Sequence, residues 1–157
     1  MPQIPHPYFA DIDTDALEDD VDVCWEAELP VNGDEVTTLL WAQQGATALP
    51  ELDAFATFLQ QVETADKLAR AALLQCLEQD RSFIDFHVQE IEGANYPDQP
   101  EAFVRAMQLV NIGLWAVPSA RDTPIVLDYM LDPEHSDQIL AVCFYADGTL
   151  GDVCWES

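Results

Sequence analysis

The side chains whose spacing comes closest to a chemical site are the carboxylates between residues 11 and 22. Acids stand there at relative positions one, three, five, nine and twelve, as in a calcium-binding loop. Such a loop also needs glycine at position six, for a sharp turn, and an apolar residue at position eight, whereas this sequence has Ala16 and Glu18. The proline-rich segment before the acids does not supply the upstream helix of such a site either. The pattern therefore predicts a solvated acidic face and no metal centre.

His87, with Asp85 and Glu90 nearby, forms the one closely spaced ionisable cluster that contains a histidine. On a helix, residues 87 and 90 are neighbours and residue 85 points elsewhere, so the cluster offers two ligands where zinc takes three or four. His6 lies in the proline-rich lead and His135 in a predicted turn. We therefore expect histidines that have structural partners or face solvent, and we assign no catalytic residue, metal or cofactor.

The four cysteines are scattered and contain no Cys-x-x-Cys pair: Cys24, Cys76, Cys143 and Cys154. This spacing excludes a zinc ribbon and a thioredoxin-type motif, and it predicts reduced, mostly buried thiols. Cys24 and Cys154 would meet if their predicted strands paired, but flanking carboxylates raise a thiol pKa and make it a poor nucleophile. The sequence also lacks the glycine-rich loops and the nucleophile elbow, which argues against the common enzyme classes. A hydrolase that uses only carboxylates is not excluded by this absence.

The charge of the chain constrains its partners. Thirty acidic residues stand against five basic ones, which gives a formal net charge of −25. All Lys and Arg residues lie between positions 67 and 121, and the first 66 residues carry fifteen acids and no base. Affinity for nucleic acids and for anionic membranes comes mainly from Lys and Arg, so we expect neither as a partner. The charge favours a basic protein partner, and the alternative is a role in solvation at high salt.

With 157 residues, 49% of them apolar, the chain is long enough for one domain with its own core. We expect a single domain over residues 1–157, in which residues 1–20 form an extended acidic lead-in. No segment reaches the ~20 apolar residues of a membrane span. The N-terminus has no basic region followed by an apolar stretch, so the expected location is cytoplasmic.

The apolar pattern changes period twice along the chain. Residues 21–29 alternate and residues 34–41 are rich in apolar and β-branched side chains, and Asn32-Gly33 between them predicts a hairpin with a type I′ turn. From Pro50 the spacing is helical, with Thr64 as the expected cap of the second helix. The predicted helices carry apolar stripes over residues 52–62, 68–77, 83–91 and 103–110.

Strands are predicted again around and after Gly113, at residues 112–117, 125–131, 139–146 and 149–155, with Asp147-Gly148 as a tight turn. The unbroken apolar run over 139–145 predicts a central strand that is covered on both faces. The order of hairpin, helices and meander predicts an α+β fold. It is a two-layer sandwich with an N-terminal β-hairpin, central helices and a C-terminal antiparallel meander, whose helices pack on one antiparallel sheet.

One pentapeptide, Asp-Val-Cys-Trp-Glu, occurs at residues 22–26 and again at residues 152–156. In each copy Val and Trp share one face of the predicted strand, and Asp, Cys and Glu share the other. We interpret the copies as two strands with the same structural role in one sheet, where neighbouring positions would bring them together. Trp25 and Trp155 are expected in the core.

Short motifs spread over nearly the whole chain carry a family resemblance. They are Pro7-Tyr8-Phe9, Asp85-Phe86-His87, residues 113–118, Leu127-Asp128-Tyr129, and the ending with Asp147-Gly148 and Glu156-Ser157. Together they resemble small acidic bacterial proteins of a family of unknown function, the domain of unknown function numbered two thousand and four. The resemblance implies a two-layer α/β sandwich and no assigned activity or catalytic residue. By analogy alone, some small acidic bacterial proteins neutralise toxins.

We therefore expect a non-enzymatic binding protein that docks a basic protein, as an inhibitor, an immunity-type factor or an adaptor. The predicted binding residues are an acidic face and two aromatic anchors: Asp11, Asp13, Asp15, Asp19, Asp20, Asp22, Glu26 and Glu28, with Tyr8 and Phe9. The alternative is a small metal-assisted hydrolase that combines carboxylates of residues 11–22 with His87 or His135.

Overall fold

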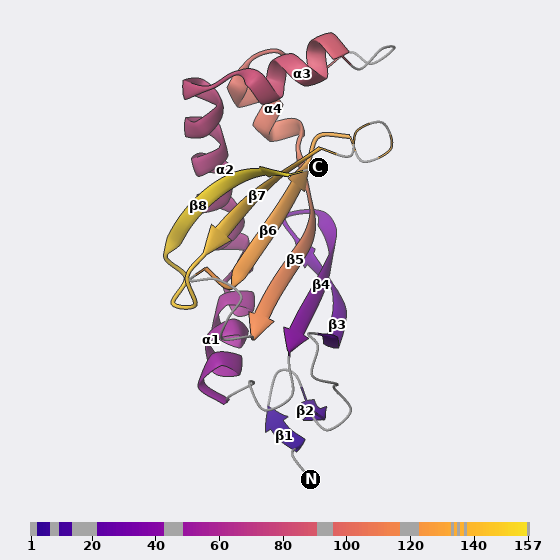
Figure 1. Cartoon of the computed structure of the whole chain (residues 1–157), viewed down its shortest axis with the longest axis vertical. Coiled ribbons are helices and arrows are strands. Elements are labelled where there is room, and N and C mark those ends of the chain that lie inside the picture. The colour runs from indigo at the N-terminus through magenta and orange to yellow at the C-terminus, as the bar shows by residue number, and fades with distance from the viewer. Residues whose placement is uncertain are drawn as a thin grey trace.

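A computed structural model describes residues 3–6, 10–13, 22–42, 49–90, 96–116, 123–132, 134, 136 and 138–156. The elements in these ranges are β1 (Gln3–His6), β2 (Ala10–Asp13), β3 (Asp22–Val31), β4 (Asp34–Ala42), α1 (Leu49–Gln60), α2 (Val62–Gln79), α3 (Ser82–Glu90), α4 (Pro100–Ala106), β5 (Gln108–Ala116), β6 (Ile125–Met130), β7 (Ile139–Phe144) and β8 (Leu150–Glu156). Six strands form one sheet in the order β3-β4-β5-β6-β7-β8, and β1 pairs with β2 separately. In Figure 1 the sheet faces the viewer, α1 and α2 lie behind it, and α3 and α4 stand at its upper end. This is the predicted α+β arrangement of hairpin, helices and meander.

β3 and β4 form the predicted hairpin, and its turn has the predicted geometry. Asn32 has φ 49° and Gly33 has φ 96°, the two positive angles that a type I′ turn requires. The second tight turn is confirmed as well. Gly148 has φ 89°, and the carboxylate of Asp147 accepts a hydrogen bond from the backbone N–H of Thr149 at 2.8 Å.

The expectation of one antiparallel sheet is wrong at one place, between β4 and β5. These strands run parallel, with Thr37 opposite Asn111 and Trp41 opposite Trp115. A parallel pair needs a crossover that returns the chain to the starting end of the sheet, and the helices between β4 and β5 supply it. Figure 1 shows α2 running along the back of the sheet to the end where β5 begins. The pairings from β5 to β8 are antiparallel, as the predicted meander requires.

The core lies between the helices and one face of the sheet. Ile112, Leu127 and Val142 stand side by side on β5, β6 and β7, and all three are completely buried. From the helix layer, Phe58 of α1 meets Phe144 edge to face, with 5.2 Å between ring centroids. The side chains of the sheet that face the helices therefore form one continuous apolar layer with them.

β7 is covered on both faces, as its apolar run predicts. On the face turned away from the helices, Ala141 and Cys143 are buried in a second, small cluster with Val126, against which Trp115 packs. A central strand with neighbours on both sides and apolar cover above and below has no polar alternation, which explains the unbroken run in the sequence.

The boundary between α4 and β5 differs from the prediction. Val110 belongs to β5 and not to a helix. Arg70 of α2 donates hydrogen bonds from Nη1 to the carbonyl oxygens of Val104 and Met107, at 2.9 and 2.8 Å, and so fixes the chain where it leaves α4. The apolar residues at 107, 109 and 110 fit a helix as well as a strand, so their period alone could not place this boundary.

The starts of α2 and α3 show how local polar groups set the helix ends. Thr64 is not the cap of α2, which begins at Val62 without a side-chain cap. α3 follows Asp80, whose Oδ1 accepts hydrogen bonds from the N–H and the hydroxyl of Ser82, at 3.0 and 2.6 Å. A carboxylate in this position satisfies a backbone donor at the start of a helix.

The two copies of the repeated pentapeptide lie on β3 and β8, the opposite edges of the sheet. They are therefore not neighbours, and the strand pairing that would have brought Cys24 and Cys154 together is not formed. The first copy also contains a bulge, because Val23 stands opposite Trp41 and Trp25 stands opposite Leu40. The bulge interrupts the regular backbone pairing on which the prediction for this copy depended.

Trp155 faces the helices but is not the core residue that we predicted, because it is 44% exposed. Its ring stands edge to face against Phe83, with 5.0 Å between centroids, and its Nε1–H donates to Gln138 Oε1 at 2.7 Å. The edge position of β8 explains this exposure, since one flank of the ring has no neighbouring strand. Trp25, on the other edge strand, is half-buried and packs against the core.

Candidate binding face

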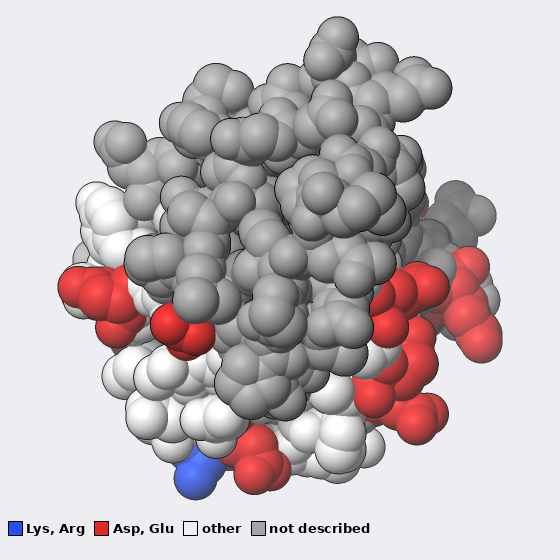
Figure 2. Space-filling model, turned by 90° about the horizontal axis from the view of Figure 1, so that it is seen from below, with Lys and Arg blue, Asp and Glu red and all other residues white. Residues whose placement is uncertain are grey.

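The face of the sheet opposite the helices is here called the outer face, and no described helix covers it (Figure 1). Exposed carboxylates stand on its two edge strands, Glu26 and Glu28 on β3 and Asp152 and Glu156 on β8, and Glu35 stands on β4 next to the first edge. The described strands of this sheet contain no Lys or Arg. Figure 2, a view from below, shows the largest group of Asp and Glu on the side where β3 lies in Figure 1, with smaller groups on the opposite side and beside the basic side chain in view.

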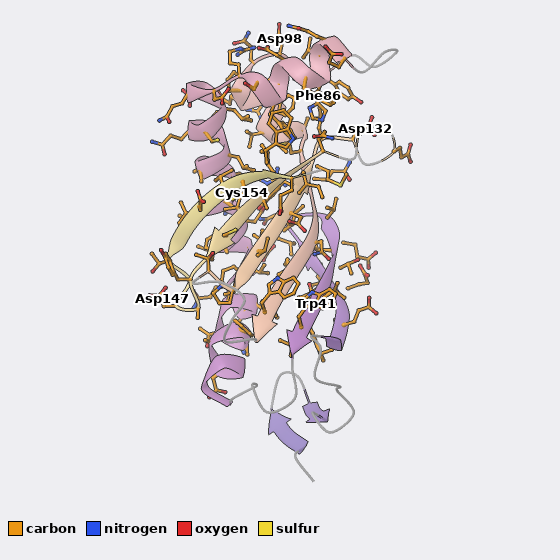
Figure 3. All side chains as sticks on the ribbon, viewed as in Figure 1. Trp41, Phe86, Asp98, Asp132, Asp147 and Cys154 are labelled. Atoms are coloured by element: carbon orange, nitrogen blue, oxygen red, sulfur yellow. The ribbon has the colours of Figure 1, made fainter. Side chains whose placement is uncertain are left out.

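Two tryptophans stack on the outer face. Trp41 and Trp115 are partners across the parallel pairing of β4 with β5, and their rings are within 5° of parallel with centroids 4.9 Å apart. Both are half-buried, and Figure 3 shows Trp41 on the side of the sheet turned away from the helices. Gly113 gives the second ring its room, because an added Cβ there would stand 3.0 Å from Trp115 Nε1. A side chain at position 113 would therefore force the Trp115 ring to shift by a few tenths of an ångström.

A hollow of about 160 Å³ opens beside the tryptophan pair. It is lined by Trp41, Asn111, Gly113, Trp115, Val126, Asp128 and Glu156. Asn111 Nδ2 donates to Asp128 Oδ2 across the β5–β6 pairing, at 3.4 Å. The hollow thus joins an aromatic wall to two carboxylates and one amide. Such a set attracts a cation that also has apolar or π surface.

Much of the predicted acidic face lies outside the described residues, as do both predicted anchors: Tyr8, Phe9, Asp15, Asp19 and Asp20. Asp11 and Asp13 belong to β2 and Asp22 begins β3, and only their backbone is described. Glu26 and Glu28 are exposed on the outer face, where Glu28 Oε1 accepts a hydrogen bond from Thr37 Oγ1 at 2.8 Å. The structure thus places these two predicted acids on the face that carries the tryptophan pair.

His87 is completely buried and has structural partners, one of the two states predicted for the histidines. Its Nδ1 lies 2.8 Å from the carbonyl oxygen of Phe83, and its Nε2 lies 2.8 Å from Ser136 Oγ. A carbonyl only accepts hydrogen bonds, so Nδ1 carries the proton and Nε2 accepts from the serine hydroxyl. Burial lowers the pKa of His87, which keeps the ring neutral.

The contact between Ser136 and His87 has the atoms of a nucleophile and its base, but both groups serve the fold. Ser136 is 7% exposed, and its Oγ also accepts the backbone N–H of Gln138 at 3.2 Å. His87 cannot form a hydrolase site with residues 11 and 13, because β2 and α3 lie at opposite ends of the molecule in Figure 1. His135 lies outside the described residues.

Two of the described cysteines, Cys76 and Cys154, are thiols of low reactivity. Partial desolvation, followed by the charge of Asp152, raises the pKa of Cys154, and partial burial followed by the charge of Asp80 raises the pKa of Cys76. The predicted effect of neighbouring carboxylates is therefore confirmed for Cys154. The burial of the described cysteines is mixed, since Cys143 is buried, Cys76 is half-buried and Cys154 is exposed.

A polar network inside the molecule is centred on Asp66 of α2, which is 2% exposed. Its carboxylate accepts hydrogen bonds from Arg70 Nε at 3.1 Å, from Tyr129 Oη at 2.5 Å and from Asn32 Nδ2 at 2.8 Å. The guanidinium of Arg70 also lies 5.2 Å from the centre of the Tyr129 ring. These contacts tie α2 to the hairpin turn and to β6, so their role is structural.

No described helix is both long and apolar enough to cross a membrane. Within the described ranges, no three His, Cys, Asp or Glu side chains are grouped so that they could hold a metal ion. No protein-family model, no curated protein and no solved structure matches this chain. The resemblance to the family of unknown function therefore stays a prediction.

Trp41 and Trp115 were not among the predicted anchors. Leu39, Leu40 and Trp41 are consecutive apolar residues, so their order does not show which of them faces outward. A signal does exist in the same strand, because Trp41 has the phase of Glu35 and Thr37, which mark the polar face. The pairing of β4 with β5, which makes the stack, joins segments on either side of the helices and has no local signal.

Proposed function

We propose that this protein is a non-enzymatic binding protein that docks a basic protein through the outer face, as an inhibitor, an immunity-type factor or an adaptor. The observation that carries the proposal is the composition of this face, which has a tryptophan pair inside and carboxylates at both edges, on strands without Lys or Arg. Binding interfaces combine a desolvated aromatic centre with a polar rim in this way.

The electrostatics support a basic partner in particular. Glu26, Glu28 and Glu35 are exposed on neighbouring strands, and the chain as a whole carries −25. Such a field speeds encounter with a cationic protein and weakens as salt is added, while it repels nucleic acids and anionic membranes. We include a bacterial source and a cytoplasmic location in the proposal, and thiols outside disulfide bonds at Cys76, Cys143 and Cys154 support the latter.

Two triple variants with the same change in charge test this function. The first replaces acids of the outer face, Glu26→Gln, Glu28→Gln and Glu35→Gln. The control replaces exposed acids of the helical part, Glu78→Gln, Glu90→Gln and Asp98→Asn. Each protein is used to capture partners from the source cells, and association rates with a captured partner are measured at several salt concentrations.

We expect the wild type and the control to capture the same basic protein, with an association rate that falls as salt is added. The outer-face variant should associate more slowly and with a flatter salt dependence, because the steering charges are gone. Equal rates for the two variants, or an acidic partner, would contradict the proposal and leave the charge with the role of solvation in high salt.

A further inference from the structure

The hollow beside the tryptophan pair has a size and a lining that suit one cationic side chain. Its volume of about 160 Å³ is well below the ~300–1,000 Å³ of pockets that enclose whole small molecules. One wall is the stacked pair Trp41 and Trp115, and the carboxylates of Asp128 and Glu156 line the same space. The occupant must therefore be small, positively charged and able to lie against an aromatic ring.

We propose that this hollow receives an arginine side chain of the basic protein partner, an inference that rests on the proposed function and names its central contact. A guanidinium is planar, stacks on indole rings and donates hydrogen bonds in a fork that matches carboxylates. An ammonium group is compact and strongly hydrated, so it gains less from the flat wall of Trp115. The amide of Asn111, at the same hollow, offers one more polar partner.

The interior of this protein shows the same chemistry with its own arginine. Arg70 is held by the carboxylate of Asp66 at 3.1 Å, and its guanidinium lies 5.2 Å from the centre of the Tyr129 ring. It also donates hydrogen bonds to two carbonyl oxygens. The outer hollow offers the corresponding set: carboxylates, an aromatic face and an amide oxygen.

A second copy of this chain does not fit the hollow as well as a basic protein does. Each copy carries −25, and the described strands around the hollow have no Lys or Arg to insert. Two outer faces would set Glu and Asp side chains of one copy against those of the other, and like charges in contact oppose association. Charge complementarity therefore favours the arginine of a different, basic chain.

Two peptides of equal charge, hexa-arginine and hexa-lysine, test the site on the intact protein by calorimetry at fixed ionic strength. We expect the wild type to prefer hexa-arginine about tenfold, within the range of a cation–π contact combined with a paired carboxylate. Trp115→Leu and Asp128→Asn should lose this preference. Glu78→Gln, on the helical side, should keep it. Glu156→Gln alters an exposed side chain and should weaken the preference without loss of the fold, which thermal unfolding checks.

Gly113→Ala adds a test of geometry, because its methyl group presses on the Trp115 ring without a change of charge. It too should reduce the arginine preference. Equal binding of the two peptides by the wild type would overturn the proposal. So would a preference for hexa-arginine that is as strong in Trp115→Leu and Asp128→Asn as in the wild type. Self-association that Trp115→Leu abolishes would overturn it as well, since the occupant would then be a second copy.

The outcomes separate this inference from the proposed function. If a captured basic protein depends on Glu26, Glu28 and Glu35 while hexa-arginine shows no preference, the docking function stands and the arginine site falls. If the peptide preference holds but no basic protein is captured, the hollow binds arginine, but the docking of a protein falls and with it the protein partner as the source of that arginine.

Discussion

Replacement of Asp66 by alanine should destabilise the protein more than replacement of any exposed acid. Its side chain is 3% exposed, and that of its partner Arg70 is 23% exposed, so the pair is shielded from water. Removal of one member of a buried ion pair leaves the other charge uncompensated, which costs about 3–5 kcal/mol. The variant also removes the carboxylate that accepts hydrogen bonds from the Tyr129 hydroxyl and the Asn32 amide.

The size of the effect follows from this geometry. A loss of about 3–5 kcal/mol is a large part of the ~5–15 kcal/mol by which domains are usually stable. For a chain of this length it lowers the melting temperature by about 6–20 °C, since 1 kcal/mol corresponds to about 2–4 °C. Asp66→Asn should cost less, because an amide oxygen can still accept one of the hydrogen bonds.

Urea unfolding of Asp66→Ala, Asp66→Asn and Glu101→Gln measures the difference directly. Glu101 pairs with Arg105 at the same helical spacing, but at 3.4 Å and with side chains 77% and 75% exposed. Removal of this pair should cost no more than about 0.5 kcal/mol. A loss below about 1 kcal/mol for Asp66→Ala, at an unchanged dependence on urea, would refute the claim that the network holds the fold together.

Three further predictions concern the charge of the whole chain, the pKa of the buried His87 and the contact between Phe83 and Trp155. The melting temperature should rise with NaCl, because salt screens the self-repulsion of a −25 chain over about 10 Å at 0.1 M, and a flat curve would show that the acids are already compensated. Burial lowers the pKa of His87, so below about pH 6.5 the unfolded chain takes up a proton that the folded one does not, and stability should fall by up to about 1.4 kcal/mol per pH unit until the folded-state pKa is reached. An unfolding series from pH 7.5 to 5.5 should show a steeper fall for the wild type than for His87→Gln, and equal slopes would contradict the assignment. Phe83→Ala should cost about 3–5 kcal/mol and Trp155→Ala clearly less, because Phe83 is 2% exposed and Trp155 is 44% exposed; similar losses in urea would contradict the edge position of the indole.

The sequence predicts local structure well where a backbone geometry admits only a few residue types. Asn32-Gly33 and Asp147-Gly148 mark both tight turns, because positive φ angles admit few other residues. The unbroken run over 139–145 marks the central strand β7, and the order of hairpin, helices and meander gives the layers. These signals are local, so they need no knowledge of the partner strands.

Long-range pairing is the part of the fold that the sequence does not reveal. The copies of the repeated pentapeptide have the same local pattern, yet they lie on opposite edges of the sheet, and the exposure of Trp155 follows from that position alone. The same holds for the candidate binding face, since Trp41 and Trp115 meet only because β4 pairs with β5. Glu26 and Glu28, in contrast, could be predicted to lie on one polar face, because alternation within β3 is a local signal.

The parallel pairing of β4 with β5 also sets an order of events in folding. The β3–β4 hairpin and the β5–β8 meander join strands that follow each other in the chain, whereas the pairing of β4 with β5 must close across all four helices. Contacts of such long sequence separation carry a large entropic cost and form slowly, so we expect this pairing to form after the hairpin and the meander. The Trp41 and Trp115 rings stack across it. The optical signal of this stacked pair therefore reports, without an added label, when β4 pairs with β5 during folding.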